Sequence, residues 1–126
     1  MAKNKEPSQR QLRVGEEIRH MLADIFLRED YSVKKLHGIT ITVTEVDISP
    51  DMRNATAYIS PMGGKLSIQH VAGLLNTATG EFNRAIAKKL TMKFAPRLRF
   101  SEDTRMQYAA KIEALLDKVN KEEEQS

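Results

Sequence analysis

The chain has 126 residues, 40% of them hydrophobic, which suits one globular domain with a core and is too short for two ordinary domains. It contains no cysteine and no run near the ~20 apolar residues of a membrane span, which excludes disulfides, thiolate metal sites and a spanning helix. The net charge of +3 is a weak indicator by itself. We expect a cytoplasmic protein that does not engage a membrane.

The first predicted element is a helix over residues 8–27. Ser8 followed by Gln11 is the pattern of a capping box, which pairs with the first free amides of a helix. Gly15 interrupts the helix, and we expect it to be exposed at a cost of about 1 kcal/mol relative to alanine. Residues 28–38 are polar without a period and predict a loop. The apolar residues of the helix recur at helical spacing: Leu12, Ile18, Met21, Leu22, Ile25 and Phe26.

Two strands are predicted next, because the apolar period changes to two. In GITITVTEVDIS the inward positions start at Ile39, and the phase slips by one residue at Glu45. A β-bulge near Glu45 would restore the facing. The residues from Ser49 to Asp51 are typical of a turn, and 52–60 alternate again. We therefore expect an antiparallel hairpin that ends at the Pro61–Gly64 segment.

Helical spacing returns from Lys65 and continues in phase to Leu90, but Thr77, Thr79 and Gly80 interrupt it. One continuous helix with a glycine penalty of about 1 kcal/mol fits the period. A helix, a kink and a second helix also fit, with Thr79 as the cap of the second helix. Such a break would expose backbone amides beside Arg84 and suit a phosphate group.

After Pro96, the run RLRF alternates and predicts a third strand with its leucine and phenylalanine inward. A last helix is expected over 104–119, followed by a disordered charged tail at 120–126. Residues 1–7 are expected to be flexible, which leaves one domain over 8–119. A small sheet with helices on one face is an α+β architecture.

The positive charge is concentrated before the last helix. Residues 65–100 contain seven basic side chains and one acidic one, whereas residues 101–126 contain four and seven. A one-sign patch is typical of a polyanion binder, although a solvated face balanced by the acidic last helix is equally compatible with the charges. The candidate contacts have no acidic residue between them: Arg84, Lys88, Lys89, Lys93, Arg97 and Arg99.

Three segments together resemble the ribosome-binding factor A family of bacterial small-subunit maturation factors, in a match over about 12–119. They are ITVTEVDISPDMRNATAYIS, the ATG of residues 78–80, and PRLRFSEDT. The resemblance implies a KH-like domain of the bacterial type, with order helix, strand, strand, helix, kink, helix, strand and an additional C-terminal helix. It also implies that an alanine-x-glycine kink, here Ala78 and Gly80, replaces the usual GxxG loop and excludes the continuous helix. Arg97 stands where family members commonly have an acidic residue, so it could belong to a surface peculiar to this chain.

The resemblance further implies a factor that binds the small (30S) ribosomal subunit and its 16S ribosomal RNA, and we expect this factor to be non-enzymatic and monomeric. Its expected role is to assist late maturation and 5′-end processing of that RNA, especially in the cold. We expect RNA contacts mainly through phosphate and sugar, from Ala78, Gly80 and the six cations above. A regulatory KH-type protein acting on transcripts and a protein-protein adaptor are the alternatives.

Enzymatic chemistry has no support in the residue pattern. GGKLS lacks the first glycine and the hydroxyl of a phosphate loop, and the three histidines show no ligand spacing. Adjacent carboxylates such as Glu16 and Glu17 point in different directions on a helix and do not form an acid-base pair. We therefore expect no metal, no cofactor and no small-molecule substrate. With 6% aromatic residues, a stacking platform of the kind used by other RNA-binding sheets is not expected either.

Overall fold

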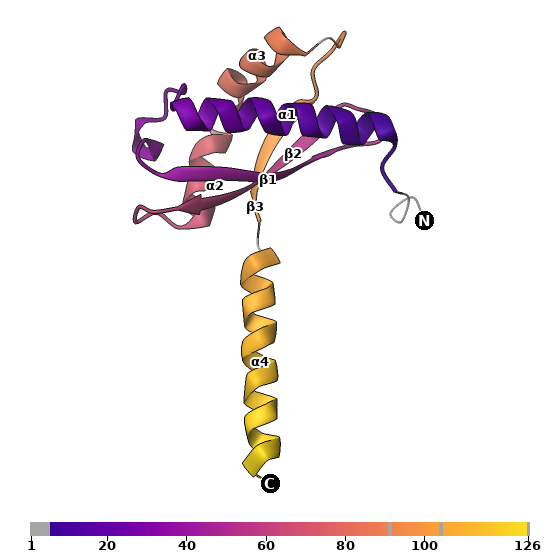
Figure 1. The fold of residues 1–126 in the computed structure, drawn as a ribbon. Coiled ribbons are helices and arrows are strands. Elements are labelled where there is room, and N and C mark those ends of the chain that lie inside the picture. The colour runs from indigo at the N-terminus through magenta and orange to yellow at the C-terminus, as the bar shows by residue number, and fades with distance from the viewer. Residues whose placement is uncertain (1–5, 91, 104, 126) are drawn as a thin grey trace.

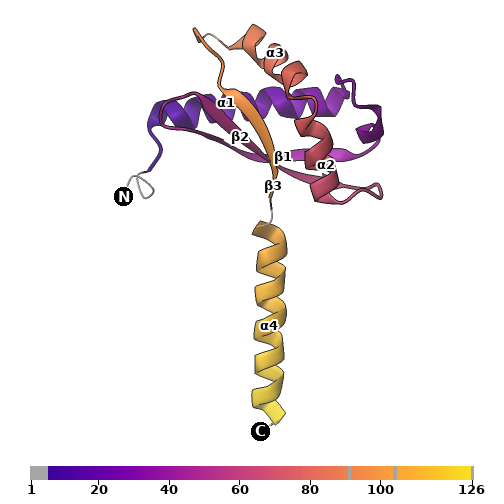
Figure 2. The same ribbon diagram turned by 180° about the vertical axis from the view of Figure 1, so that it is seen from behind.

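The computed structural model describes residues 6–90, 92–103 and 105–125, so most of the start that we expected to be flexible lies outside the described residues. The elements, in chain order, follow the expected sequence of helices and strands (Figures 1 and 2). They are α1 (Gln9–Arg28), the short 3-10 helix η2 (Lys34–Leu36), β1 (Thr40–Ile48), β2 (Asn54–Met62), α2 (Ile68–Asn76), α3 (Thr79–Lys89), β3 (Arg97–Glu102) and α4 (Arg105–Gln125).

Helix α1 begins as predicted. The Ser8 hydroxyl accepts a hydrogen bond from the Gln11 amide, and the Gln11 side chain accepts one from the Ser8 amide. The expectation for Gly15 was wrong, because this residue is buried against β1. A Cβ atom on Gly15 would lie 2.5 Å from the carbonyl oxygen of Val46. The glycine therefore permits a close approach of the helix backbone to the strand.

The sheet has the order β1-β2-β3, with β1 and β2 antiparallel and β2 and β3 parallel. The pairing register shifts between Val43 and Glu45, which confirms the bulge and leaves Thr44 as the extra residue. The shift keeps Val43 and Val46 on the same buried side. Because β3 runs parallel to β2, the chain must cross over between them, and α2 and α3 form that crossover.

One core joins the three helices of the domain to the inward side chains of the sheet. Phe26 of α1, Phe82 of α3 and Phe100 of β3 form an aromatic cluster with ring centroids 5.1 to 6.1 Å apart. Tyr31 and Leu36 from the loop after α1 are buried in the same core, although their segment is polar. The outward residues of the strands remain exposed or half-buried. The helices therefore cover only one face of the sheet, as the α+β prediction required.

Helix α4 is longer than the predicted last helix. It continues to Gln125, so residues 120–125, which we expected to be disordered, are helical in the structure. It extends away from the domain (Figures 1 and 2), and Ile112, Leu115, Leu116 and Val119 on its apolar side are exposed. Within the ranges that the structure describes, no helix is long and apolar enough to cross a membrane.

Candidate nucleic-acid interface

The interruption at 77–80 is a true kink between two helices. Helix α2 ends with Thr77 as its C-cap, and α3 begins at Thr79 with Ala78 as its N-cap. Thr79 was the wrong choice of cap, because it is already the first helical residue and no side chain caps α3. The amides of Thr77 and Ala78 donate to carbonyls of α2. The next amides, of Thr79 and Gly80, are first-turn donors, which have no acceptor inside their own helix.

Two asparagines fix the kink against the outer edge of β3. The Asn76 carboxamide donates to the carbonyl of Phe100 at 2.9 Å and accepts from its amide at 2.8 Å. The Asn83 oxygen accepts from the Leu98 amide at 3.1 Å. These bonds satisfy alternate backbone groups of an edge strand that would otherwise be open to another chain. They also hold the end of α2 and the start of α3 in one orientation.

Glu81 makes a third attachment. Its carboxylate accepts hydrogen bonds from the Ser32 amide at 2.8 Å and from the Ser32 hydroxyl at 2.6 Å. This carboxylate also lies in the first turn of α3, where a negative charge is favourable. Glu81 is the only acidic residue between residues 65 and 100, and its carboxylate is bound to the loop after α1.

Gly80 and Arg84 lie together on α3. A Cβ atom on Gly80 would lie 3.5 Å from a guanidinium nitrogen of Arg84, so this side chain folds back over the first turn. Arg84 also lines a hollow of about 360 Å³ between α3 and the start of β3, which we call the α3–β3 groove. Its lining residues are Asn83, Arg84, Ala87, Ala95, Pro96 and Arg97. Arg84 and Arg97, 13 positions apart, thus share one groove.

The other predicted cations are distributed around this groove. Lys88 and Lys89 are exposed in the last turn of α3, and Lys88 follows Arg84 by one turn on the same side of the helix. Arg99 is exposed on the outward face of β3, two residues beyond Arg97. The structure therefore brings Arg84 and Arg97 together directly and leaves Lys88, Lys89 and Arg99 on adjoining surfaces.

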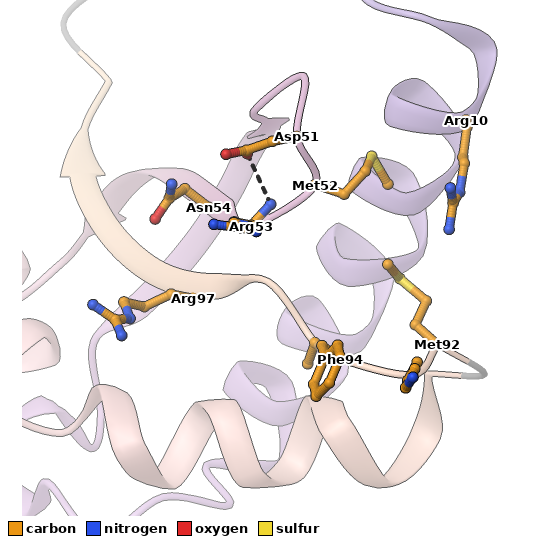
Figure 3. Close-up of a pocket in the computed structure, with 10 residues that line it drawn as sticks. Arg10, Asp51, Met52, Arg53, Asn54, Met92, Phe94 and Arg97 are labelled. Carbon is orange, nitrogen blue, oxygen red and sulfur yellow. Dashed lines mark hydrogen bonds between the residues drawn. The ribbon is translucent and has the colours of Figure 1, made fainter.

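Lys93 and Arg97 line a second hollow, of about 750 Å³, between the start of α1, the β1–β2 turn and the segment before β3 (Figure 3). We call it the Arg53 cleft. Sequence reasoning missed Arg53, because only the fold brings it and Arg10 beside Lys93. The cleft is lined by Arg10, Asp51, Met52, Arg53, Asn54, Met92, Lys93, Phe94, Ala95 and Arg97.

The one carboxylate of the Arg53 cleft is held by the turn itself. Asp51 accepts a hydrogen bond from the Ser49 hydroxyl at 2.6 Å and one from the Arg53 amide at 3.1 Å. The Ser49 hydroxyl chiefly, and then the Arg53 amide, lower the pKa of this carboxyl below its ordinary value. Asp51 thus stays ionised while four cationic side chains surround the cleft, which leaves an excess of positive charge.

The predicted cations are not neutralised by nearby carboxylates. Across 6–90, 92–103 and 105–125, none of the six forms an ion pair, and every ion pair found lies between residues 16 and 37. The acidic residues of α4 that we considered as a balancing layer lie on a helix that extends away from the domain (Figure 1). Among the described residues no group of histidines and carboxylates could hold a metal ion. This arrangement can bind a polyanion electrostatically.

The sheet, the helices on one face and the kink between α2 and α3 define a KH-like domain, and its uncovered cations give it the charge of a nucleic-acid-binding module. The sequence model of the family described as "Ribosome-binding factor A" matches residues 10–116. The chain belongs to that family, as the resemblance in the hairpin, the kink and the third strand predicted.

Relatives support both the family and the fold. A ribosome-binding factor A from Pelagibacter ubique is 46% identical over 114 residues, covering 90% of this chain and 93% of its own. The crystal structure of ribosome-binding factor A from Thermus thermophilus matches with a TM-score of 0.58 at 18% identity, covering 73% of this chain and 94% of its own. A homology model of the Thermus thermophilus factor, fitted into the cryo-EM map of a 30S complex, matches with a TM-score of 0.57 at 20% identity. That match covers 71% of this chain and 91% of the fitted chain.

Proposed function

We propose that this chain is a non-enzymatic assembly factor that binds the free small ribosomal subunit through its 16S ribosomal RNA. It acts as a monomer in the cytoplasm and assists late maturation and 5′-end processing of that RNA, with its largest effect in the cold. Membership of the family supports this proposal, as does the 30S complex of the Thermus thermophilus factor. The observation that carries it is the set of cations around the kink that no described carboxylate neutralises.

Arg84 is the centre of the proposed contact. Its guanidinium lies over Gly80, so a phosphate group at the first turn of α3 would meet both the charge and the free amides of Thr79 and Gly80. Lys88 and Lys89 extend the positive surface along α3, and Arg97 extends it across the α3–β3 groove. Lys93 and Arg99 are the outer contacts of the same surface.

The form of the kink favours folded RNA over a clamped single strand. Only Thr77 and Ala78 separate α2 from α3, whereas the GxxG loop of other KH domains clamps about four nucleotides by their backbone. A short kink with cations on both sides can contact phosphates of a structured RNA without reading its bases. Affinity should therefore depend on the folded RNA of the subunit and only weakly on sequence.

Gly80→Ala tests the contact at the kink. A methyl group on Gly80 would be at an ordinary contact distance from Arg84, and the residue is helical, so the change should not reduce stability. If a phosphate approaches the first-turn amides, the same methyl group should obstruct it and weaken subunit binding by roughly tenfold. Equal affinity of the variant and the wild type for purified subunits would remove Gly80 and its neighbouring amides from the contact.

Sedimentation of a cold-grown lysate tests the function as a whole. The tagged chain should migrate with free small subunits and be absent from large subunits and translating ribosomes. Cells that lack it should accumulate 16S precursor with an unprocessed 5′ end. If the protein instead remains at the top of the gradient and selects short transcripts by sequence, it is a regulatory KH-type protein. If its complexes survive nuclease and high salt, it is a protein-protein adaptor.

A further inference from the structure

Phe94 is an exposed aromatic residue in an electropositive cleft. Its side chain is 75% exposed, although phenylalanine is usually buried. The ammonium group of Lys93 lies over its ring, 5.7 Å from the centroid, within the range of a cation–π contact. Phe94 takes no part in the aromatic cluster of the core. The ring is therefore available to a flat partner from outside the molecule.

The surroundings of this ring combine charge with an apolar lining. Arg10, Arg53 and Arg97 are lining residues of the Arg53 cleft and come from three separate segments, the start of α1, the β1–β2 turn and the start of β3 (Figure 3). Met52 and Met92 line the same cleft, and both are half-buried and packed against the core. A volume of about 750 Å³ lies within the range of small-ligand sites. The cleft thus offers an apolar surface for a ring and cations for a neighbouring anion.

Asn54 adds a polar group of the kind that reads base edges. Asn54 is one of the residues that line the cleft, and its carboxamide has two donors and one acceptor oxygen. No hydrogen bond of this side chain to another described residue is present, whereas its backbone is held by Ser49. A ligand with a flat ring, an edge of donors and acceptors, and adjacent negative charges matches all these features. A nucleotide has that chemistry.

We propose that the Arg53 cleft binds one unpaired nucleotide of the subunit RNA, with its base stacked on Phe94. The flanking phosphates contact Arg10, Arg53 and Arg97, and Lys93 moves from the ring toward a phosphate. This site rests on the proposed function, because the RNA is that of the small subunit. It adds one stacked base to a surface that otherwise contacts only the backbone.

Phe94→Ala is the direct test, with binding to purified free small subunits measured over a series of salt concentrations. Loss of one stacked base should weaken binding by roughly 5- to 150-fold. The slope of log affinity against log salt should not change, because stacking releases no counterions. Phe94→Trp should retain the affinity, since a larger ring can also stack. The matched control is Leu27→Ala, which removes a side chain that is 83% exposed and lies outside the cleft.

The outcomes separate this site from the proposed function. Weaker binding by Phe94→Ala with an unchanged slope, and wild-type affinity for Phe94→Trp and Leu27→Ala, would support a stacked nucleotide. Wild-type affinity for Phe94→Ala would overturn the site and leave subunit binding intact. A reduced slope for Phe94→Ala would also overturn it, because the loss would then be electrostatic. If the wild type does not bind subunits, the proposed function itself fails. Thermal midpoints of all variants should coincide, since both side chains are exposed.

Discussion

Gly15→Ala should destabilise the domain even though alanine is the better helix former. Gly15 lies in the interior of α1 and faces β1 across a backbone-to-backbone contact. An added Cβ would lie 2.5 Å from the Val46 carbonyl oxygen and 3.6 Å from the Ile48 side chain. The first of these contacts is too short for unbonded atoms, and a carbonyl oxygen in a paired strand cannot rotate away as a flexible side chain would.

The magnitude follows from two opposing effects. Alanine gains about 1 kcal/mol over glycine inside a helix. To accept the methyl group, α1 must withdraw from β1 by roughly half an ångström, and overpacking of this kind costs about 1–3 kcal/mol. Because backbone opposes the methyl group on the strand side, we expect a cost near the upper end. The net loss in the free energy of unfolding should be about 1–2 kcal/mol.

Gly73→Ala is the matched control, since it is the same substitution inside another helix. Gly73 is exposed in α2, and apart from its chain neighbours and the nearby backbone of its own helix no atom lies within 4 Å of its Cβ position. This variant should gain about 0.5–1 kcal/mol. Urea denaturation of the wild type and both variants gives the three free energies, with equal m values expected. If Gly15→Ala is as stable as Gly73→Ala, then α1 does not approach β1 as described.

Three further predictions concern the kink, the turn and the charge. Asn76→Ala should lower the free energy of unfolding by about 1–3 kcal/mol in urea denaturation, because it removes two hydrogen bonds to Phe100. The pKa of Asp51 is lower in the folded state than in the unfolded state. Its carboxylate therefore stabilises the fold fully above the unfolded pKa of about 4, and this stabilisation is lost as the pH falls through the folded pKa. Asp51→Asn should therefore reduce the decline of the thermal midpoint between pH 6 and about pH 3, and an unchanged decline would refute this role. Binding to subunits should weaken with salt at a slope of roughly −3 to −4 if about four phosphates are neutralised, and a flat response would contradict the contact.

Much of the fold is predictable because each element carries a local signal. Alternation in β1 and its slip at Glu45 located both the buried face and the bulge. Ser8 and Gln11 marked the start of α1 through the hydrogen bonds that they make. The position of the kink followed from poor helix formers combined with a family resemblance, since the period alone also permitted one helix.

The remaining features depend on tertiary contacts that have no local signal. Gly15 has the same local pattern whether it is exposed or packed on Val46. Asn76 and Asn83 appear as ordinary polar positions until β3 lies beside them. Arg53 and Phe94 are 41 positions apart and meet only because the β1–β2 turn faces the segment before β3. The concentration of positive charge was therefore predictable from the sequence, whereas the Arg53 cleft was not.

We propose that the cations of α3 bind RNA and do not stabilise the fold. Binding of the double variant Arg84→Glu with Lys88→Glu to purified free small subunits tests it most directly. The control is Lys111→Glu with Lys118→Glu on α4, which changes the net charge equally at exposed positions. We predict that the α3 variant loses affinity and that its salt slope falls by roughly 1.5 to 2, while its thermal midpoint and the α4 control stay near wild type. Equal loss in both variants, or a large drop in the thermal midpoint of the α3 variant, would contradict the claim.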